Sequence, residues 1–189
     1  MNKKVLCCLL VICFLIPCFC SCKFMTLSDA QAKEELERLL PKAKELTEIF
    51  YGKGLPYDAL SEDSTDYYAF VSKDAAYQSI DEIKKVAETV FSAEYLVSIY
   101  EYAFEGTDYF ASRYFMSFTE GEQRLKINIQ HEPMALLQQI DIDSAKVVEG
   151  TPATAVVEVN VITSKGEEKK KKITLVNQDG IWVLDSAAY

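Results

Sequence analysis

Tyrosine is the residue type whose placement in this chain most favours a functional surface. Ten of the eleven tyrosines lie between residues 51 and 114. A tyrosine side chain offers a broad apolar face and a polar tip, which suits protein interfaces and stacking on sugars. We expect Tyr100 and some strand tyrosines to be core residues. The exposed remainder, near Tyr57, Tyr67 and Tyr109, is predicted to line a binding cleft.

Nucleophilic hydrolysis has little support in the sequence. A catalytic serine or cysteine needs a base, usually a histidine held by a carboxylate. His131 is the only histidine, it stands just before Pro133 in a predicted loop, and the chain has no Gly-x-Ser-x-Gly motif. We therefore expect a surface or structural role for His131 and assign no catalytic residue.

Acidic residues are the remaining candidates for chemistry. Asp141 and Asp143 point off one face of a predicted strand, and Asp63 and Asp66 flank a predicted loop. Neither pair has the spacing of a calcium-binding loop, so we interpret them as solvated side chains and predict no metal and no other cofactor. Paired carboxylates could also perform acid–base catalysis. With 29 acidic residues, however, the sequence does not single out a pair.

The charge of the chain limits its partners. Twenty basic residues stand against 29 acidic ones, for a net charge of −9. Such a domain repels phosphate backbones and anionic wall polymers, so no nucleic-acid partner is expected. The acidic balance favours a basic protein partner instead.

The first residues have the pattern of an export signal. Met1 to Lys4 supply positive charge, Val5 to Ile16 form an apolar run, and a cysteine-rich segment of small residues follows Pro17. This order is typical of a secretory leader. The apolar run, Val5 to Phe19 at its longest, is shorter than the roughly 20 residues that a spanning helix needs.

All six cysteines lie within the first 22 residues, so the mature domain is expected to hold neither a disulfide nor a thiolate metal site. A cysteine cluster at the end of an export signal resembles the lipobox of bacterial lipoproteins, whose cysteine is acylated and becomes the new N-terminus. We predict lipidation of Cys22, because the small Ser21 precedes it, although Phe19-Cys20 departs from the usual lipobox. A plain secretory signal and an uncleaved anchor are the alternatives.

The domain organisation follows from this assignment. Residues 1–21 are the predicted signal peptide, 22–29 a lipid-anchored tether, and 30–189 a single α+β domain on the outer face of the cytoplasmic membrane. Cleavage would remove two lysines and no acid, so the mature chain would be still more acidic. We expect a monomer.

Helices are predicted in the first half of the domain. Apolar residues recur at three- and four-residue intervals over 29–51, 80–91 and 93–105. A serine that can cap the helix precedes each segment: Ser28, Ser79 and Ser92. Pro41 interrupts the first pattern, so we expect a kink or a break near Leu40.

The second half changes to strand periodicity. Together with an earlier segment, it contains seven predicted strands: 66–73, 113–118, 125–129, 140–142, 157–161, 173–176 and 181–184. Short turns between them predict an antiparallel sheet with one face covered by the helices. This order is that of cone-shaped α+β folds, with helices on a curved sheet, as in the nuclear-transport-factor-2-like and cystatin-like groups. Lys169 to Lys172 are predicted to keep an edge strand from pairing with another molecule, and anion binding is the alternative.

Several segments resemble the DL-endopeptidase inhibitor family of Gram-positive secreted proteins and lipoproteins. They are the stretch from Tyr57, Asp66-Tyr-Tyr-Ala-Phe-Val, Ser79-Ile-Asp-Glu-Ile-Lys-Lys, Val90-Phe-Ser-Ala-Glu-Tyr and Asp179-Gly-Ile-Trp-Val-Leu-Asp-Ser. The likeness covers about residues 30–189, and its closing segment is also similar to nuclear-transport-factor-2-like lipoproteins. It implies extracytoplasmic binding in which members block wall-degrading endopeptidases by occluding the active-site cleft. No inhibitory motif transfers residue by residue.

Three functional hypotheses remain open. The first is a non-catalytic binding or inhibitory lipoprotein that docks on an envelope protein such as a peptidoglycan hydrolase. The second is a small-ligand carrier or enzyme that uses an internal cavity, which would need convergent polar groups. The third is a structural envelope protein without a defined ligand. A closed core would favour the first hypothesis, and a pocket with convergent carboxylates the second.

Overall fold

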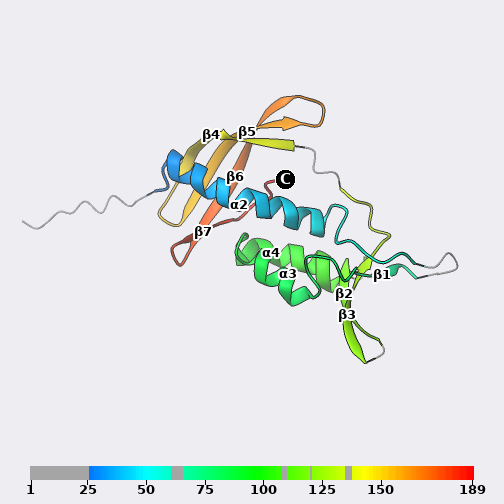
Figure 1. The fold of residues 1–189 in the computed structure, drawn as a ribbon. Helices are drawn as coiled ribbons and strands as arrows, with labels where there is room; N and C mark the ends of the chain where they lie inside the picture. Colours follow the sequence, from blue (N-terminus) through cyan, green and yellow to red (C-terminus); the bar gives the residue numbers. More distant parts are fainter. Residues whose placement is uncertain (1–25, 61–65, 108–109, 120, 135–137) are drawn as a thin grey trace, which may run out of the picture.

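The framework consists of a long helix and two antiparallel sheets (Figure 1). The structure is a computed structural model that describes residues 26–60, 66–107, 110–119, 121–134 and 138–189. Its helices are α2 (Asp29–Phe50), α3 (Ile80–Ala87), α4 (Ala93–Tyr100) and the π-helix η1 (Glu101–Glu105). Its strands are β1 (Tyr68–Phe70), β2 (Tyr114–Thr119), β3 (Glu122–Asn128), β4 (Gln138–Gly150), β5 (Thr154–Thr163), β6 (Glu168–Gln178) and β7 (Ile181–Leu184). The fold class is therefore α+β, as predicted.

Helix α2 begins where the sequence predicts and ends within one residue of the predicted end. The Ser28 side chain accepts a hydrogen bond from the Gln31 backbone, and the Gln31 side chain bonds back to the Ser28 backbone, which confirms the predicted cap. The sequence predicts a kink or a break near Leu40, and the helix does not break there but continues through Pro41. An interior proline costs about 3 kcal/mol. Burial of the apolar stripe offsets it: Leu36, Leu39, Leu40 and Ala43 are each at most 2% exposed.

The predicted caps of the next two helices are also confirmed. Ser79 and Ser92 accept hydrogen bonds from backbone groups three residues later. Helix α3 is shorter than predicted because residues 90–92 bond to β7 instead: Leu184 donates to Val90, and Ser92 donates to Leu184. Helix α4 passes directly into η1, which ends at Gly106. Gly106 has φ +73°, a conformation that favours glycine.

Four strands in the order β4-β5-β6-β7 form the large sheet. The inner face of this sheet is a row of buried aliphatic side chains that belong to the same core as α2: Val157, Val159, Val161, Ile173 and Leu175. The predicted turn between β6 and β7 is confirmed. Asp179 and Gly180 both have positive φ, 53° and 92°, as a two-residue hairpin turn with the twist of the strands requires.

The four-lysine run lies at an open edge of the large sheet. Lys169 to Lys172 pair with β5 on one side of β6. On the other side, β7 pairs with β6 only from Leu175 onward, so no strand of the described residues covers the lysines there. This position agrees with the predicted guarding of a strand edge.

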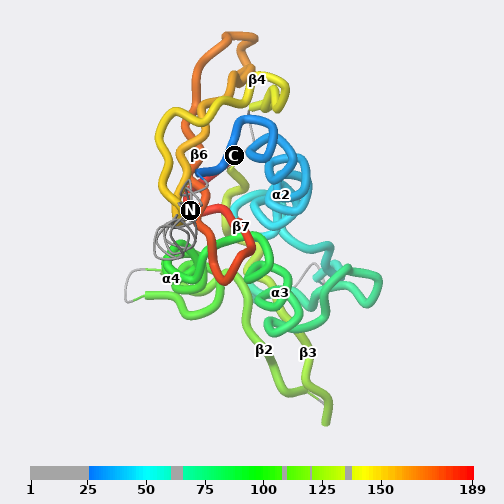
Figure 2. The backbone as a smooth tube through the Cα atoms, turned by 90° about the vertical axis from the view of Figure 1, so that its left-hand side faces the viewer, coloured from blue at the N-terminus to red at the C-terminus, as the bar shows by residue number. Residues whose placement is uncertain are grey.

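Three strands in the order β1-β3-β2 form a separate small sheet. Its inner face is also buried and consists of Ala69, Val71, Tyr114, Leu125 and Ile127. The sequence predicts one sheet, but the strands divide into two that lie at opposite ends of α2 (Figures 1 and 2). A helix of 22 residues is about 33 Å long. Its buried side chains extend from Ala32 to Phe50, and the two sheets together cover that length.

Candidate binding surface of the small sheet

The outer face of the small sheet carries three half-buried aromatic side chains, Tyr68, Phe70 and Phe115. In the strand register, Lys126 of β3 lies between Phe70 of β1 and Phe115 of β2. The rings of Tyr68 and Phe115 are perpendicular, with centroids 4.6 Å apart. Strands β1 and β2 thus place an aromatic layer on the side of the small sheet opposite the core.

Two cations are held against this layer. The guanidinium carbon of Arg124 lies 4.2 Å from the centre of the Phe70 ring, and the ammonium of Lys126 lies 4.5 Å from the same ring. Each contact of this kind contributes about 0.5–1 kcal/mol at an exposed site. Arg124 also donates a hydrogen bond of 3.2 Å to Asp58. The positions of both charges are therefore set by the ring beneath them.

A pocket of about 440 Å³ opens beside Arg124. It is lined by Phe70, Lys73, Thr119, Glu122 and Arg124. Within the described residues, Lys73 and Lys126 form no ion pair. Unpaired cations on one face are notable in a chain with a net charge of −9, where carboxylates are abundant.

The predicted binding tyrosines lie on the margins of this sheet. Tyr57 is 45% exposed and Tyr67 is 58% exposed. Tyr57 pairs with Val71, four residues from Tyr67, so the two side chains are separated by about 13 Å along the strand. By the alternation of side chains, both stand on the opposite face from Arg124. The structure thus brings Tyr57 and Tyr67 to one sheet without placing them side by side.

Two predicted positions, Tyr109 and Cys22, lie outside the described residues. None of the helices in the described part of the chain combines the length and the apolar character that a membrane crossing requires.

Several other tyrosines are structural, as predicted. The Tyr114 side chain is fully buried, and its hydroxyl donates to the Ile49 carbonyl and accepts from the Leu55 backbone. Tyr100 packs against the core beneath Lys84, whose ammonium lies 4.8 Å from its ring centre. Burial raises the pKa of Tyr51 to about 12. These hydroxyls are neutral at physiological pH and serve packing and hydrogen bonding.

His131 is occupied by structural hydrogen bonds. Its Nε2 lies 3.3 Å from the Ala111 carbonyl oxygen, which can only accept, so Nε2 carries the proton. Its Nδ1 lies 2.9 Å from the Tyr102 hydroxyl and accepts from it. Burial lowers the pKa of His131, and the nearby Arg113 lowers it further. The neutral imidazole therefore ties the segment around Ala111 to η1 and the loop after β3.

Arg113 fastens the small sheet to the end of α2. The side chain is buried, its Nε donates to the Ile49 carbonyl, and one terminal nitrogen donates to Gly52 at 2.6 Å. These carbonyls belong to the last turn of α2 and the residues just after it, where helix bonding leaves acceptors free. The other terminal nitrogen, Nη1, has no hydrogen-bond partner among the described residues.

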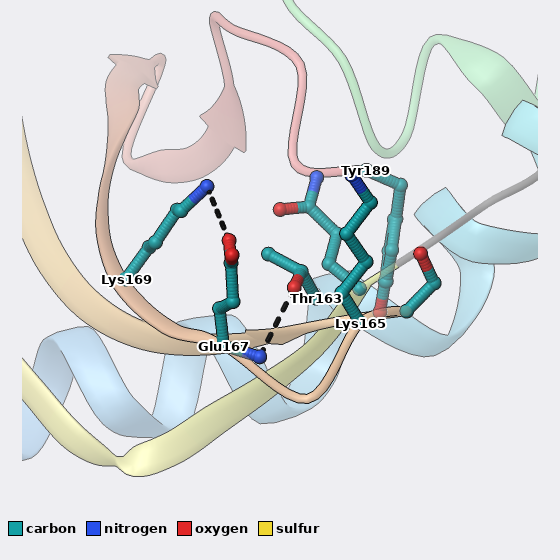
Figure 3. Close-up of a pocket in the computed structure, with 7 residues that line it drawn as sticks. Thr163, Lys165, Glu167, Lys169 and Tyr189 are labelled. Atoms are coloured by element: carbon teal, nitrogen blue, oxygen red, sulfur yellow. Dashed lines mark hydrogen bonds and ion pairs between the residues drawn. The ribbon is translucent and has the colours of Figure 1, made fainter.

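A second pocket, of about 330 Å³, lies at the hairpin between β5 and β6 (Figure 3). On one side, Lys169 pairs with Glu167 at 2.8 Å, and the Glu167 backbone donates to the Thr163 hydroxyl. Lys165 and Tyr189 stand on the other side. The one carboxylate side chain within the lining, that of Glu167, is paired with a lysine.

A third pocket, of about 520 Å³, lies along α2 and includes Glu45 and Glu48. Burial by itself would raise the pKa of Glu45, but hydrogen bonds from Lys42 and Tyr77 lower the pKa below its usual range. Glu45 is therefore ionised at neutral pH and is not available as a general acid.

Two acidic side chains of β4, Asp141 and Asp143, take part in local contacts. Asp143 forms an ion pair with Lys33 of α2, and its backbone donates to the Asp141 side chain. No group of three or more histidine, cysteine or acidic residues in the described ranges is placed to hold a metal ion.

Comparison with known proteins gives no relative: no family model matches the chain, and no curated protein matches it. The surface must be interpreted from its own chemistry. Sequence reasoning missed Phe70, Arg124 and Lys126 as a group. The alternation of Arg124, Leu125 and Lys126 does place both cations on one strand face, but only the strand register reveals the aromatic rings beside them.

Proposed function

We propose that this chain is a non-catalytic binding module, lipid-anchored through Cys22 on the outer face of the cytoplasmic membrane. Its docking surface is the margin of the small sheet that carries Tyr57 and Tyr67. One observation carries the proposal: the aromatic side chains of Tyr57 and Tyr67 are exposed at the small sheet, whereas the space between α2 and the large sheet is filled by buried aliphatic side chains. Exposed aromatic groups of this kind mark interaction sites.

The chemistry of the titratable groups supports binding over catalysis. Both nitrogens of His131 are used in hydrogen bonds that hold loops together. The pKa of Glu45 in the α2 pocket is lowered, the opposite of the shift that a general acid needs at neutral pH.

The proposed partner is an envelope protein, specifically a peptidoglycan hydrolase of the DL-endopeptidase type. This choice rests on the resemblance of residues 30–189 to the endopeptidase inhibitors and on the net charge of −9, which favours a basic partner. Tyr57 and Tyr67 would supply apolar contacts at the sheet margin. A cone-like arrangement related to the nuclear-transport-factor-2-like or cystatin-like groups is the matching proposal for the fold.

Capture from envelope extract tests the partner. The protein, purified from membranes in detergent, should retain a hydrolase, and its addition should slow digestion of isolated cell walls by that enzyme. Tyr67→Ser should weaken both effects, because it removes a 58% exposed aromatic group. Val97→Ser, which changes a 68% exposed residue on α4, is the matched control. Unchanged wall digestion at saturating protein, with no hydrolase retained, would remove the inhibitor proposal.

The anchor needs its own test. Cys22→Ala should abolish incorporation of labelled palmitate and release the protein from the membrane fraction. Labelling that persists in Cys22→Ala and disappears in Cys20→Ala would move the acylation site to the earlier cysteine.

The pocket along α2 favours a second candidate function, the binding of a small apolar molecule. Its walls include Ile49, Leu55 and Pro56, and its volume of about 520 Å³ falls in the range of small-molecule sites. Leu55→Gln should abolish uptake of a fluorescent apolar probe if this pocket is used. Probe uptake that the substitution leaves unchanged would exclude the pocket.

A further inference from the structure

We infer that the pocket beside Arg124 binds the carboxylate of a peptide ligand. This inference does not depend on the proposed hydrolase partner, because it concerns an anionic ligand and the opposite face of the small sheet from Tyr57 and Tyr67.

The first step is the fixed position of the guanidinium. The Arg124 side chain is 28% exposed, stacks on Phe70 at 4.2 Å, and donates from one terminal nitrogen to Asp58. Within the described residues, its Nε and Nη1 donate to no other group. An arginine held on an aromatic ring with donors left over is prepared for planar, two-point recognition of an oxyanion.

The second step is the charge around the pocket. Lys73 lines it, Lys126 lies on the same Phe70 ring, and neither is ion-paired within the described residues. Two acids oppose these three cations. Among the described residues, Asp58 is already paired with Arg124, so Glu122 of the lining is the one of these two acids that forms no ion pair. The local field is positive although the whole chain is acidic.

The third step chooses a carboxylate over a phosphate. The guanidinium group of an arginine can donate two parallel hydrogen bonds to either a carboxylate or a phosphate. Glu122 stands in the same lining and would repel a doubly charged phosphate, but it can accept a hydrogen bond from an amide N–H. A peptide carries both a carboxylate and amide N–H groups a few ångströms apart. The pocket volume of about 440 Å³ suits a ligand of two or three residues.

Fluorescence anisotropy with the detergent-purified, full-length protein tests the inference. The probe is a labelled Ala-Glu-Ala peptide with a free C-terminus, and its control is Ala-Gln-Ala-amide, which has the same shape without carboxylates. The carboxylate peptide should bind in a salt-sensitive manner, and the amide should not. Equal binding of the two peptides would overturn the inference.

Substitutions then locate the site. Arg124→Gln should weaken binding of the peptide about tenfold, and Lys126→Gln about threefold. Lys85→Gln, which removes an exposed lysine of α3 outside the pocket, should leave the affinity unchanged. An unaltered affinity in a folded Arg124→Gln protein would contradict the assignment. Arg124→Lys is the control for misfolding. It keeps the positive charge but loses the two-point donor geometry, so its affinity for the peptide should still fall.

Two further arms define the ligand. Inorganic phosphate should displace the labelled peptide weakly from the wild-type protein. It should displace the peptide more strongly from Glu122→Gln, because that substitution removes the repulsion between the Glu122 carboxylate and phosphate. Phosphate that displaces the peptide equally well from both proteins would overturn the carboxylate preference. The wall peptide Ala-γ-Glu-Lys-Ala-Ala, compared with Ala-Glu-Ala, identifies the source: tighter binding of the first indicates cell-wall stems, and tighter binding of the second indicates protein carboxylates.

Discussion

The two sheets differ most on their outer faces. On the large sheet, Lys170 of β6 pairs with Glu158 of β5 at 2.6 Å and Lys172 of β6 with Glu149 of β4 at 3.4 Å, so positive and negative side chains pair across the strands. On the small sheet, Arg124 and Lys126 rest on the Phe70 ring, and Lys126 and the nearby Lys73 form no ion pair within the described residues. A face whose charges are mutually paired is adapted to water, and a face with unpaired cations over half-buried aromatic rings is adapted to a ligand.

The inner faces of the sheets are alike. Both contribute to one continuous apolar core: α2 packs on β4 of the large sheet, and Ile49 near its end accepts a hydrogen bond from Tyr114 of the small sheet. The two sheets therefore differ in the chemistry of their outer faces and not in how well they are packed. The contacts of Arg113 and Tyr114 with the end of α2 hold the small sheet in place. Removing them should therefore affect the small sheet more than the large one.

The largest effect is expected from Arg113→Ala. It removes two hydrogen bonds from a buried cation to the end of α2, and the free energy of unfolding should fall by about 3 kcal/mol. Denaturant titration measures this loss. Amide hydrogen exchange should show protection falling first in β1, β2 and β3, with β4 to β7 retained. Uniform loss of protection in both sheets would show that they do not open separately.

A matched pair of glycine substitutions sharpens the comparison. Gly54 and Gly166 have similar positive φ values of +79° and +76°, so alanine introduces similar backbone strain at both. An alanine methyl at Gly54 would meet Ile127 at 2.5 Å and Arg113 at 2.7 Å, whereas at Gly166 it would meet nothing within 4 Å. Gly54→Ala should therefore destabilise the protein by about 2 kcal/mol more than Gly166→Ala. Equal melting temperatures for the two variants would contradict the tight packing beneath the small sheet.

The pH dependence of the His131 contacts gives a smaller effect. Burial lowers the pKa of His131 in the folded protein, so the unfolded chain takes up a proton first as the pH falls below about 6.5. Stability is full above that value and declines as the pH falls toward the lowered folded pKa. His131→Gln should reduce the slope of unfolding free energy between pH 7 and pH 5.5. An unchanged slope would mean that the imidazole is not desolvated.

The smallest effect is expected from Glu158→Gln on the outer face of the large sheet. Its partner Lys170 is 70% exposed, and pairs of this kind are screened by water and salt. Thermal unfolding should be indistinguishable from the wild type. A clear loss of stability would show that the ion pairs of the large sheet are structural and would weaken the contrast drawn between the faces.

Local features of the fold were accessible from the sequence, and long-range ones were not. The serine caps and the turn at Asp179 depend on a few adjacent residues, so their chemistry is visible in the chain. The division into two sheets depends on β3 pairing with β1 and β2 rather than with β4, which no local pattern specifies. The passage of α2 through Pro41 likewise depends on tertiary burial.

The candidate site follows the same rule. Exposure of Tyr57 and Tyr67 could be anticipated from residue type, but the stacking of Arg124 on Phe70 joins residues from different strands. The buried position of Arg113 runs against the expectation for an arginine, and the sequence around it gives no sign of its bonds to the end of α2.

The start of α2 is fastened to β4 by side chains. Asp29 accepts a hydrogen bond from the Val147 backbone, and Lys33 forms an ion pair with Asp143. With an anchor at Cys22, any mechanical load transmitted along the tether would enter the domain here and pass into the large sheet. The small sheet, at the far end of the helix, would stay unloaded, so tension at the membrane would leave its ligand face undisturbed.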